Sequence, residues 1–255
     1  MSAGLGPKAR FTDRVEDYVR FRPGYPQALL DAITRIARLG PGRRAADVGS
    51  GTGIFTRALL ATGTDVVGVE PNDAMRRAAE ASLSGHPQFE SSSGCAEATG
   101  LADASVDLIV AAQAFHWFEP LRARAEFMRI LKPGGYVALV WNQRSDTPFN
   151  RAYEAMLERF APDYGLVREK DRAAESKIRA FFAPSLPRLL QFDNEQRLDE
   201  VGLRGRLMSS SYAPRQGDPL HVAIMSELAT IFSAHEKGSL VAIGYETILW
   251  YAPRD

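Results

Sequence analysis

The sequence predicts an α/β fold in which helices cover both faces of a doubly wound, mostly parallel sheet. Two observations lead to this prediction. Short apolar segments such as 106–111 recur along the chain, and continuous runs of this kind are typical of strands covered on both faces. Between them lie segments whose apolar residues recur at helical spacing, as in 26–39. Strands that alternate with helices of this length usually form parallel sheets.

The elements follow one another regularly up to residue 141. We expect strands at 44–49, 65–70, 89–93, 106–111 and 136–141. We expect helices at 26–39, at 53–62, from Asn72 through Leu83, and from Pro120 to a stop at Lys132-Pro133-Gly134-Gly135. Asn72 is a favourable helix cap, and a proline followed by glycines ends a helix in a turn.

The pattern changes at Pro148. Two helices are expected without a strand between them, at 150–162 and 171–183, and we place them over the carboxyl-terminal edge of the sheet. The remaining elements are expected to be a strand at 189–198, helices at 199–208 and 219–235, and a terminal antiparallel strand at 240–251. The sequence therefore predicts a sheet with a helical cap.

Composition limits the function classes. The 31 basic and 31 acidic residues cancel, so no basic field is expected to hold nucleic acid. The one cysteine, Cys95, excludes an intrachain disulfide framework and a multi-cysteine metal site, and we expect no metal. No apolar run approaches the length of a membrane span, and the first residues lack a leader-like apolar region. We expect a cytoplasmic protein without a membrane partner, and the sequence does not indicate its oligomeric state.

A glycine turn follows the first expected strand. Asp47 precedes Gly49, Gly51 and Gly53, which stand at alternate positions before a helix. Glycines at these positions let the main chain approach a ligand closely. The dinucleotide fingerprint is G-x-G-x-x-G without a preceding acid, whereas this turn is G-x-G-x-G after an acid. A carboxylate here suits a ligand with an α-amino group better than a pyrophosphate, and the alternative is a plain strand–helix turn.

A second acid, Glu70, ends the second expected strand, about 20 residues beyond the glycine turn. An acid at this position can bind both hydroxyls of a ribose. The alternative interpretation is a solvated acid at a strand end. Together, an acceptor for an ammonium group, an acceptor for a ribose and a glycine floor describe a site for S-adenosylmethionine.

Several segments together resemble one enzyme family. They are 47–53, 70–71, 94–97, 112–118 and 131–135. Over roughly residues 10–145 the chain is similar to class I S-adenosylmethionine-dependent methyltransferases of the small-molecule group that includes the trans-aconitate methyltransferases. The resemblance implies a Rossmann-like sheet of seven strands with an antiparallel last strand. It implies a lid and first helix at 1–40, a cofactor-binding core at 41–147, a helical cap at 148–187, and strands and helices completing the sheet and substrate pocket at 188–255.

The resemblance also implies cofactor contacts. Asp47 would hold the methionyl amine, the turn glycines would allow close approach, and Glu70 with Pro71 would bind the ribose. Ala96 would face the adenine ring, but Cys95 stands where relatives often carry Asp; either Glu97 replaces that acceptor or the contact is lost. The remaining candidates are Met75 against the ring or simply in the core, Gln113 and Phe115 along the methionyl arm, and Arg22 with Tyr18 at the methionyl carboxylate.

The implied reaction is a direct in-line displacement that moves the methyl group to a small molecule, with a carboxylate or hydroxyl oxygen favoured as acceptor. His116 is the candidate base, and its alternative role is to orient other groups. Candidate substrate contacts, each with packing or surface as the alternative, are Trp117, Trp141, Asn142, Arg206, Ser211, Tyr212 and Tyr251.

Two other classes of protein stay open at the level of the sequence. One is a non-catalytic partner or regulator that binds S-adenosylmethionine, in which the substrate site would be closed. The other is an NAD(P)-dependent oxidoreductase, which shares the sheet and the acid at Glu70 but not the G-x-G-x-G spacing.

Overall fold

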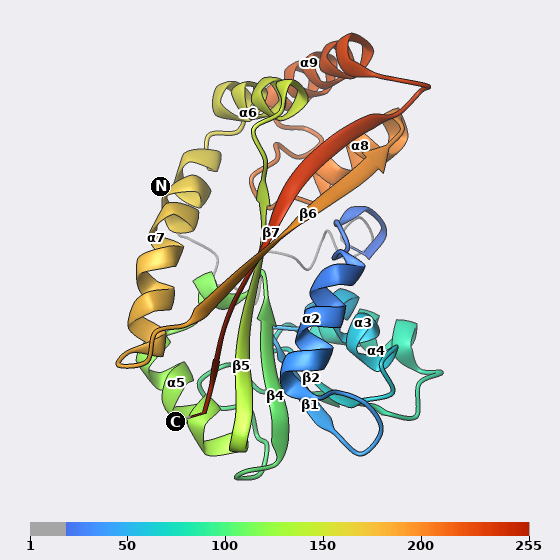
Figure 1. Ribbon diagram of the computed structural model, residues 1–255. Helices are drawn as coiled ribbons and strands as arrows, with labels where there is room; N and C mark the ends of the chain where they lie inside the picture. Colours follow the sequence, from blue (N-terminus) through green and yellow to red (C-terminus); the bar gives the residue numbers. More distant parts are fainter. Residues whose placement is uncertain (1–18, 255) are drawn as a thin grey trace.

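The computed structural model describes residues 19–254, and for residues 167–175 it describes the backbone alone. Within this part of the chain, one sheet of seven strands has the order β3-β2-β1-β4-β5-β7-β6 (Figure 1). Neighbouring strands from β3 to β5 pair in parallel, whereas β7 is antiparallel to both β5 and β6. The predicted Rossmann-like sheet with an antiparallel last strand is confirmed.

The strands lie close to the segments expected from the sequence. They are β1 (Arg44–Val48), β2 (Asp65–Val69), β3 (Phe89–Ser92), β4 (Val106–Ala112), β5 (Leu131–Arg144), β6 (Arg188–Leu198) and β7 (Val241–Pro253). The helices are α2 (Gln27–Ala37), α3 (Ile54–Leu60), α4 (Asp73–Leu83), α5 (Pro120–Ile130), α6 (Pro148–Phe160), α7 (Tyr164–Phe182), α8 (Glu200–Met208) and α9 (Pro219–His235), with a 3₁₀ turn η2 (Phe115–Trp117).

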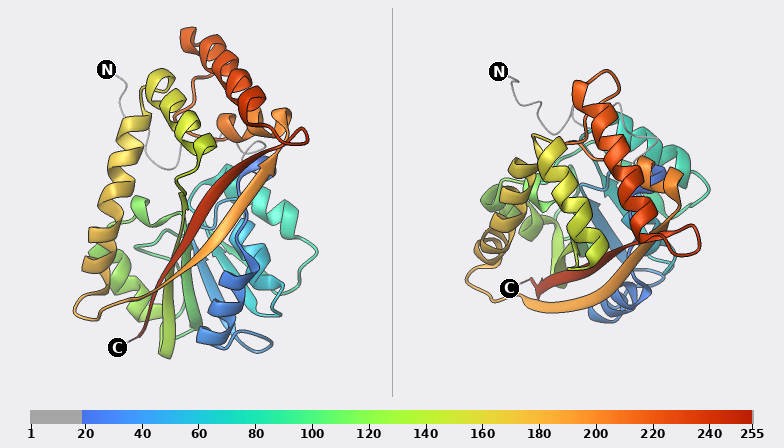
Figure 2. Two further views of the ribbon diagram at one scale, coloured as in Figure 1. Left: turned by 45° about the horizontal axis from the view of Figure 1, so that its top comes forward. Right: turned by 90° about the horizontal axis from the view of Figure 1, so that it is seen from above.

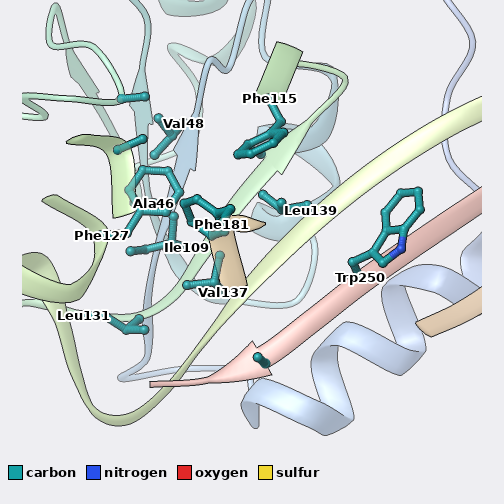
Figure 3. Close-up of a cluster of buried hydrophobic side chains, with 14 of the residues drawn as sticks. Ala46, Val48, Ile109, Phe115, Phe127, Leu131, Val137, Leu139, Phe181 and Trp250 are labelled. Atoms are coloured by element: carbon teal, nitrogen blue, oxygen red, sulfur yellow. The ribbon is translucent and has the colours of Figure 1, made fainter. Parts of the chain in front are cut away.

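Consecutive strand residues bury their side chains on opposite faces of the sheet. On β4, Leu108 packs in the cluster that includes residues of α2 and α3, and Ile109 packs in the cluster that includes α5 and α7. This alternation follows from the pleat of a strand, and burial on both faces explains the continuous apolar run at 106–111. Figure 3 shows part of the second cluster, with Phe127 of α5 and Phe181 of α7 against the sheet.

The strand β5 begins earlier than predicted. We expected a helix stop at Lys132–Gly135 and a strand from 136, but α5 ends at Ile130 and β5 starts at Leu131. Leu131 pairs with Val106, and the register shifts before Leu108 pairs with Tyr136. A side chain at Gly135 would meet the Asp107 carbonyl oxygen at 2.9 Å, so the glycine permits this close approach of two strands. The predicted turn is therefore an irregular first part of the strand.

The cap over the sheet comes from separate segments of the chain. Figures 1 and 2 show α6, α8 and α9 beyond the carboxyl-terminal ends of the parallel strands. Their buried residues share a third hydrophobic cluster with the first part of β7. The helix α7 does not follow our expectation of a position over the sheet edge, because Ile178, Phe181 and Phe182 pack with α5 on one face of the sheet. The division of the chain at residues 148 and 188 stays a prediction.

In the described part of the chain, none of the helices combines the length and the apolar character that a membrane span requires. Within the same residues, no group of three or more His, Cys, Asp or Glu side chains is arranged to hold a metal ion.

Candidate functional site

The three glycines of the turn after β1 all have positive φ angles, but they serve different purposes. A Cβ on Gly49 would lie 2.5 Å from Cβ of Ala114, and one on Gly53 would lie 2.8 Å from Cδ1 of Leu83. These two glycines allow close packing within the protein. A Cβ on Gly51 would meet only Met75 Sδ, at 3.9 Å. Among the three, Gly51 therefore leaves the main chain most open to a ligand.

Glu70 follows β2 and holds two loops together. Its Oε2 accepts the N–H of Gly51 at 2.8 Å, and its Oε1 accepts the N–H of Asn72 at 2.8 Å. Asn72 in turn caps α4 by accepting the N–H groups of Ala74 and Met75. Burial raises the pKa of Glu70, although these two hydrogen bonds act in the opposite direction. The carboxylate lies at the end of the second strand, beside the glycine turn, as the sequence predicted.

Asp47 lies beside the glycine turn and Glu70, and its side chain is buried, with 1% of the residue exposed. Its Oδ2 accepts a hydrogen bond from the Thr56 hydroxyl at 2.7 Å. Its Oδ1 is buried and has no hydrogen-bond partner among the residues that the structure describes. Burial raises the pKa of Asp47 to about 7; the Thr56 hydrogen bond lowers it, and the nearby Glu70 raises it further.

The residues of this turn fit the α-ammonium and ribose groups of S-adenosylmethionine. Buried polar atoms in native proteins are nearly always hydrogen-bonded, so the unpaired Asp47 Oδ1 indicates a missing donor. An ammonium group would supply that donor, and it would also stabilise the charged form of the carboxyl. Glu70 offers a second acceptor beside Gly51, at the end of the neighbouring strand.

The loop expected to face adenine follows β3. Cys95 and Ala98 exchange two backbone hydrogen bonds of 3.1 Å, and Ala96 between them is 3% exposed. Glu97 Oε1 accepts the N–H of Glu119 at 2.8 Å, so this carboxylate is bound to the residue that caps α5. Only Oε1 takes part in this bond, so the Glu97 carboxylate can still offer an acceptor in place of Cys95. The adenine contact of this loop, like that of Met75, stays a prediction.

Gln113 and Phe115 follow β4 and have different surroundings. Gln113 has a positive φ of 58°, and its Nε2 donates to the Asn142 carbonyl oxygen at 3.1 Å. Its side chain thus links the ends of β4 and β5. Phe115, by contrast, is 1% exposed and packs edge-on against Phe181 in the core (Figure 3). This burial argues against the side-chain contact with a methionyl arm that we expected of Phe115.

His116 lies among tryptophans at the same edge of the sheet. Its ring centroid is 4.6 Å from that of Trp117 and 5.3 Å from that of Trp141. Trp141 is 8% exposed, so its indole is mostly covered. The structure brings these three sequence-predicted residues together, and their role in catalysis or substrate binding stays a prediction.

The segment before α2 is attached to the cap and the sheet. Arg22 Nη2 donates to the Ser209 carbonyl oxygen at 2.9 Å, and Asn142 Nδ2 donates to the Gly24 carbonyl oxygen at 3.2 Å. A Cβ on Gly205 of α8 would lie 2.2 Å from the Phe21 ring, so this ring rests on the bare helix backbone. These contacts place the expected lid residue Arg22 against the cap. Tyr18, its predicted companion, lies outside the described residues.

The candidate substrate residues do not form one group. The Asn142 side chain already accepts from Thr247 at 2.5 Å and binds Gly24, so it fastens the chain. Tyr251 was wrongly expected at the substrate site: it is 9% exposed in the core cluster that includes residues of α2. The reason is topological, because β7 is antiparallel and its last residues run towards the opposite edge of the sheet.

Arg206 and Tyr212 lie in the cap, and the structure adds four residues that sequence reasoning missed. We call the group formed by these six side chains the arginine–tyrosine cluster: Arg144, Tyr153, Tyr164, Arg206, Tyr212 and Tyr245. The sequence holds one indication of this cluster, because Arg144 follows the apolar run of the fifth expected strand. Ser211, the remaining candidate, stands between α8 and Tyr212.

Comparison with known proteins supports the same class of protein as the glycine turn and its two acids, a methyltransferase. A family model described as a methyltransferase domain matches residues 46–139. An uncharacterized methyltransferase of Mycobacterium tuberculosis is 42% identical over 136 residues, which are 53% of this chain and 53% of that protein. A malonyl-[acyl-carrier protein] O-methyltransferase of Methylococcus capsulatus is 39% identical over 42% of this chain and 40% of its own length. The chain spans about half the length of the curated relatives it matches.

A solved structure extends the likeness over the cap. A protein of Anaeromyxobacter dehalogenans that is assigned to the type II methyltransferases has a TM-score of 0.67 and 27% identity. The match covers 92% of this chain and 98% of that one. Residues 46–139 are thus a methyltransferase domain, and the chain has the fold of the class I S-adenosylmethionine-dependent methyltransferases. The resemblance to the class I S-adenosylmethionine-dependent methyltransferases is confirmed.

Proposed function

We propose that this protein transfers a methyl group from S-adenosylmethionine to a small-molecule acceptor, with a carboxylate or hydroxyl oxygen as the favoured nucleophile. The buried, unpaired Oδ1 of Asp47 beside Gly51 carries this proposal. A carboxylate at this point attracts an ammonium group and repels a pyrophosphate, which disfavours the nicotinamide alternative. The match of residues 46–139 to a methyltransferase domain supports the same function.

The chain's own residues would bind and orient the cofactor. Asp47 would accept from the α-ammonium group, and Glu70 would turn from the Gly51 N–H towards the ribose hydroxyls. Bound S-adenosylmethionine supplies an electrophilic methyl group on a sulfonium that leaves as a neutral thioether. Because the cofactor is already activated, the protein contributes mainly orientation and the exclusion of water. The segment with Arg22 and Gly24, fixed between cap and sheet, suits the second task.

The acceptor determines whether a base is required. A carboxylate is already ionised at neutral pH, whereas a hydroxyl must lose its proton as it attacks. Acceptor oxygen chemistry has a parallel in the O-methyltransferase of Methylococcus capsulatus, whose similarity covers part of the chain. His116, beside Trp117 and Trp141, is the candidate base for a hydroxyl acceptor and an orienting residue for a carboxylate.

Calorimetric titration with S-adenosylhomocysteine tests the proposal. We expect micromolar binding that Asp47→Ala and Glu70→Ala both weaken at least tenfold. Asp65→Ala is the matched control, because this acid begins β2 at the opposite edge of the sheet and is exposed. Acids and phenols would then be screened for methyl acceptance from labelled S-adenosylmethionine. Binding of NADH in place of S-adenosylhomocysteine would overturn the proposed function.

A further inference from the structure

The arginine–tyrosine cluster lies where the cap meets the last residue of β5 and the first part of β7. Arg144 and Tyr245 are register partners on these two strands. The Arg144 guanidinium lies 5.7 Å from the ring centroids of both Tyr153 and Tyr164, and it donates to the Tyr164 hydroxyl. The rings of Tyr164 and Tyr212 meet edge-on with centroids 5.0 Å apart. Elements from distant parts of the sequence thus converge on one set of hydroxyl and guanidinium groups.

The charges in this cluster do not balance. Arg144 is paired with Glu154, whose Oε1 lies 3.0 Å from its Nε. Arg206 is 6% exposed, and its Nη1 donates to the neutral Ser210 hydroxyl at 3.0 Å. Among the residues that the structure describes, no carboxylate forms an ion pair with Arg206. A buried guanidinium without a counter-charge is rare, since buried charges are normally paired.

Unpaired polar atoms in the cluster also indicate that a partner is missing. Tyr153 is 1% exposed, and its hydroxyl has no hydrogen-bond partner within the described part of the chain; the same holds for Nε of Arg206. The two side chains are electrostatic neighbours, together with Tyr212 and Tyr245. An anion would supply acceptors for these buried donors and a counter-charge for Arg206, which has no carboxylate partner among the described residues.

The cluster lies some distance from the expected position of the cofactor. Val140 pairs with Ala112 at the end of β4, close to the glycine turn, and Arg144 stands four residues further along β5. A strand rises by about 3.3 Å per residue, so the cluster lies roughly 13 Å beyond the strand end. An anion bound there is therefore separate from an atom that reacts beside the cofactor.

We propose that the arginine–tyrosine cluster anchors an anionic group of the methyl acceptor, a carboxylate or a phosphate, that is distinct from the atom that receives the methyl group. This inference rests on the proposed function. It names the substrates as small acids in which the atom that receives the methyl group is remote from the anionic group. Arg206 supplies the charge, and the Tyr153 hydroxyl supplies a hydrogen bond. Arg206 keeps its charge at neutral pH, because a guanidinium does not lose its proton in proteins.

Titration calorimetry of the S-adenosylhomocysteine complex with succinate, inorganic phosphate and the neutral succinamide, at constant ionic strength, tests the inference. We expect at least one of the two anions to bind and succinamide not to bind. Succinate alone would assign a carboxylate anchor, and phosphate alone a phosphate anchor. Arg206→Gln is expected to weaken anion binding at least tenfold, as loss of one charge-assisted hydrogen bond does. Arg204→Gln is the matched control, because Arg204 lies on the same helix but pairs with Glu200 at the surface.

A second variant covers the case in which Arg206→Gln does not fold. Tyr153→Phe removes only an unpaired hydroxyl, so the protein should remain folded while anion affinity falls at least threefold. S-adenosylhomocysteine affinity should stay unchanged in both variants. The inference is overturned if neither anion binds, or if both variants bind the anion as tightly as the original protein. Absence of S-adenosylhomocysteine binding would instead overturn the proposed function and with it the assignment of the anion to a methyl acceptor, and the anion titration of the cofactor-free protein would still show whether the cluster binds an anion.

Discussion

The Thr56 hydroxyl donates to Oδ2 of Asp47 at 2.7 Å, while the second carboxylate oxygen is buried with no partner among the described residues. One oxygen is thus fixed by the protein, and under the proposed function the other accepts from the ligand. Burial, the largest cause, raises the pKa of this carboxyl to about 7. Because a ligand ammonium group favours the ionised carboxyl, cofactor binding and the protonation of Asp47 oppose each other.

The first prediction is a pH dependence of cofactor binding. Below pH 7, Asp47 must lose a proton before it accepts from an ammonium group, so the affinity for S-adenosylhomocysteine should fall by up to about tenfold per pH unit. Above pH 7 the affinity should level off. Calorimetry between pH 5.5 and 8 measures this, with Asp47→Asn as the variant that binds weakly and without the slope. An equal slope in Asp47→Asn would assign the titration to another group.

The second prediction concerns the stability of the cofactor-free protein. A raised pKa means that the folded state holds its proton more tightly than the unfolded state, so the contribution of Asp47 to stability is lost as the pH rises from about 4 towards 7. Asp47→Asn should therefore stabilise the protein at pH 8, on the order of 2–4 kcal/mol, because burial raises the pKa of Asp47 from its ordinary value to about 7. The gain should shrink as the pH is lowered towards 4. Urea unfolding at several pH values checks both the sign and the trend.

The third prediction separates the glycines of the turn. Gly49→Ala places a Cβ 2.5 Å from Ala114 at a φ of +73°, and it should cost roughly 2–4 kcal/mol of stability. Gly51→Ala meets only Met75 Sδ at 3.9 Å, so it should cost about 1 kcal/mol through its positive φ alone. Gly51→Ala should nevertheless lose most of its affinity for S-adenosylhomocysteine. Thermal unfolding and calorimetry distinguish the two effects, and normal cofactor binding by Gly51→Ala would contradict the expected approach of the ligand.

The fourth prediction concerns Glu70. Its carboxylate accepts the N–H groups of both Gly51 and Asn72, and Glu70→Gln can accept only one of them while its amide faces the other. An unsatisfied buried group costs about 1–3 kcal/mol, so the variant should unfold at lower urea concentration. It should also bind S-adenosylhomocysteine at least tenfold more weakly. Glu90→Gln, at an exposed acid on β3 whose surface ion pair with Arg44 contributes little to stability, is the control and should change neither quantity appreciably. A Glu70 variant with full affinity would exclude this carboxylate from the cofactor site.

The fifth prediction tests the attachment of the segment before α2. Asn142 joins the Gly24 carbonyl oxygen to the buried hydroxyl of Thr247. Asn142→Ala removes the acceptor of the buried Thr247 hydroxyl and one of two hydrogen bonds to the Gly24 carbonyl oxygen, and we expect a loss of about 1–3 kcal/mol together with faster proteolysis near Gly24. Asn194→Ala is the milder comparison, because Asn194 is more exposed and binds the same carbonyl oxygen at 3.1 Å. Equal proteolysis of the original and variant proteins would show that Asn142 does not hold this segment.

Much of the architecture follows from patterns among residues that are close together in the sequence. The apolar run of β4, the helical spacing of α2 and the glycine turn after β1 each depend on residues close in sequence. The positions of Asp47 and Glu70 follow from the same logic, because parallel strands end at one edge of a sheet and bring their last residues together. The sequence therefore predicted the edge of the sheet at which Asp47 and Glu70 lie beside the glycine turn.

The amino-acid sequence by itself determined the class of fold, the order of the elements and the acids beside the glycine turn, because strand and helix periods and tight turns are local properties. Only the tertiary structure decided which side chains become buried together. It placed Phe115 and Tyr251 in the core, and it joined Arg144 of β5 to Tyr153 and Arg206 of the cap. No pattern in the sequence encodes such contacts, since they arise when segments distant in the chain pack against one another.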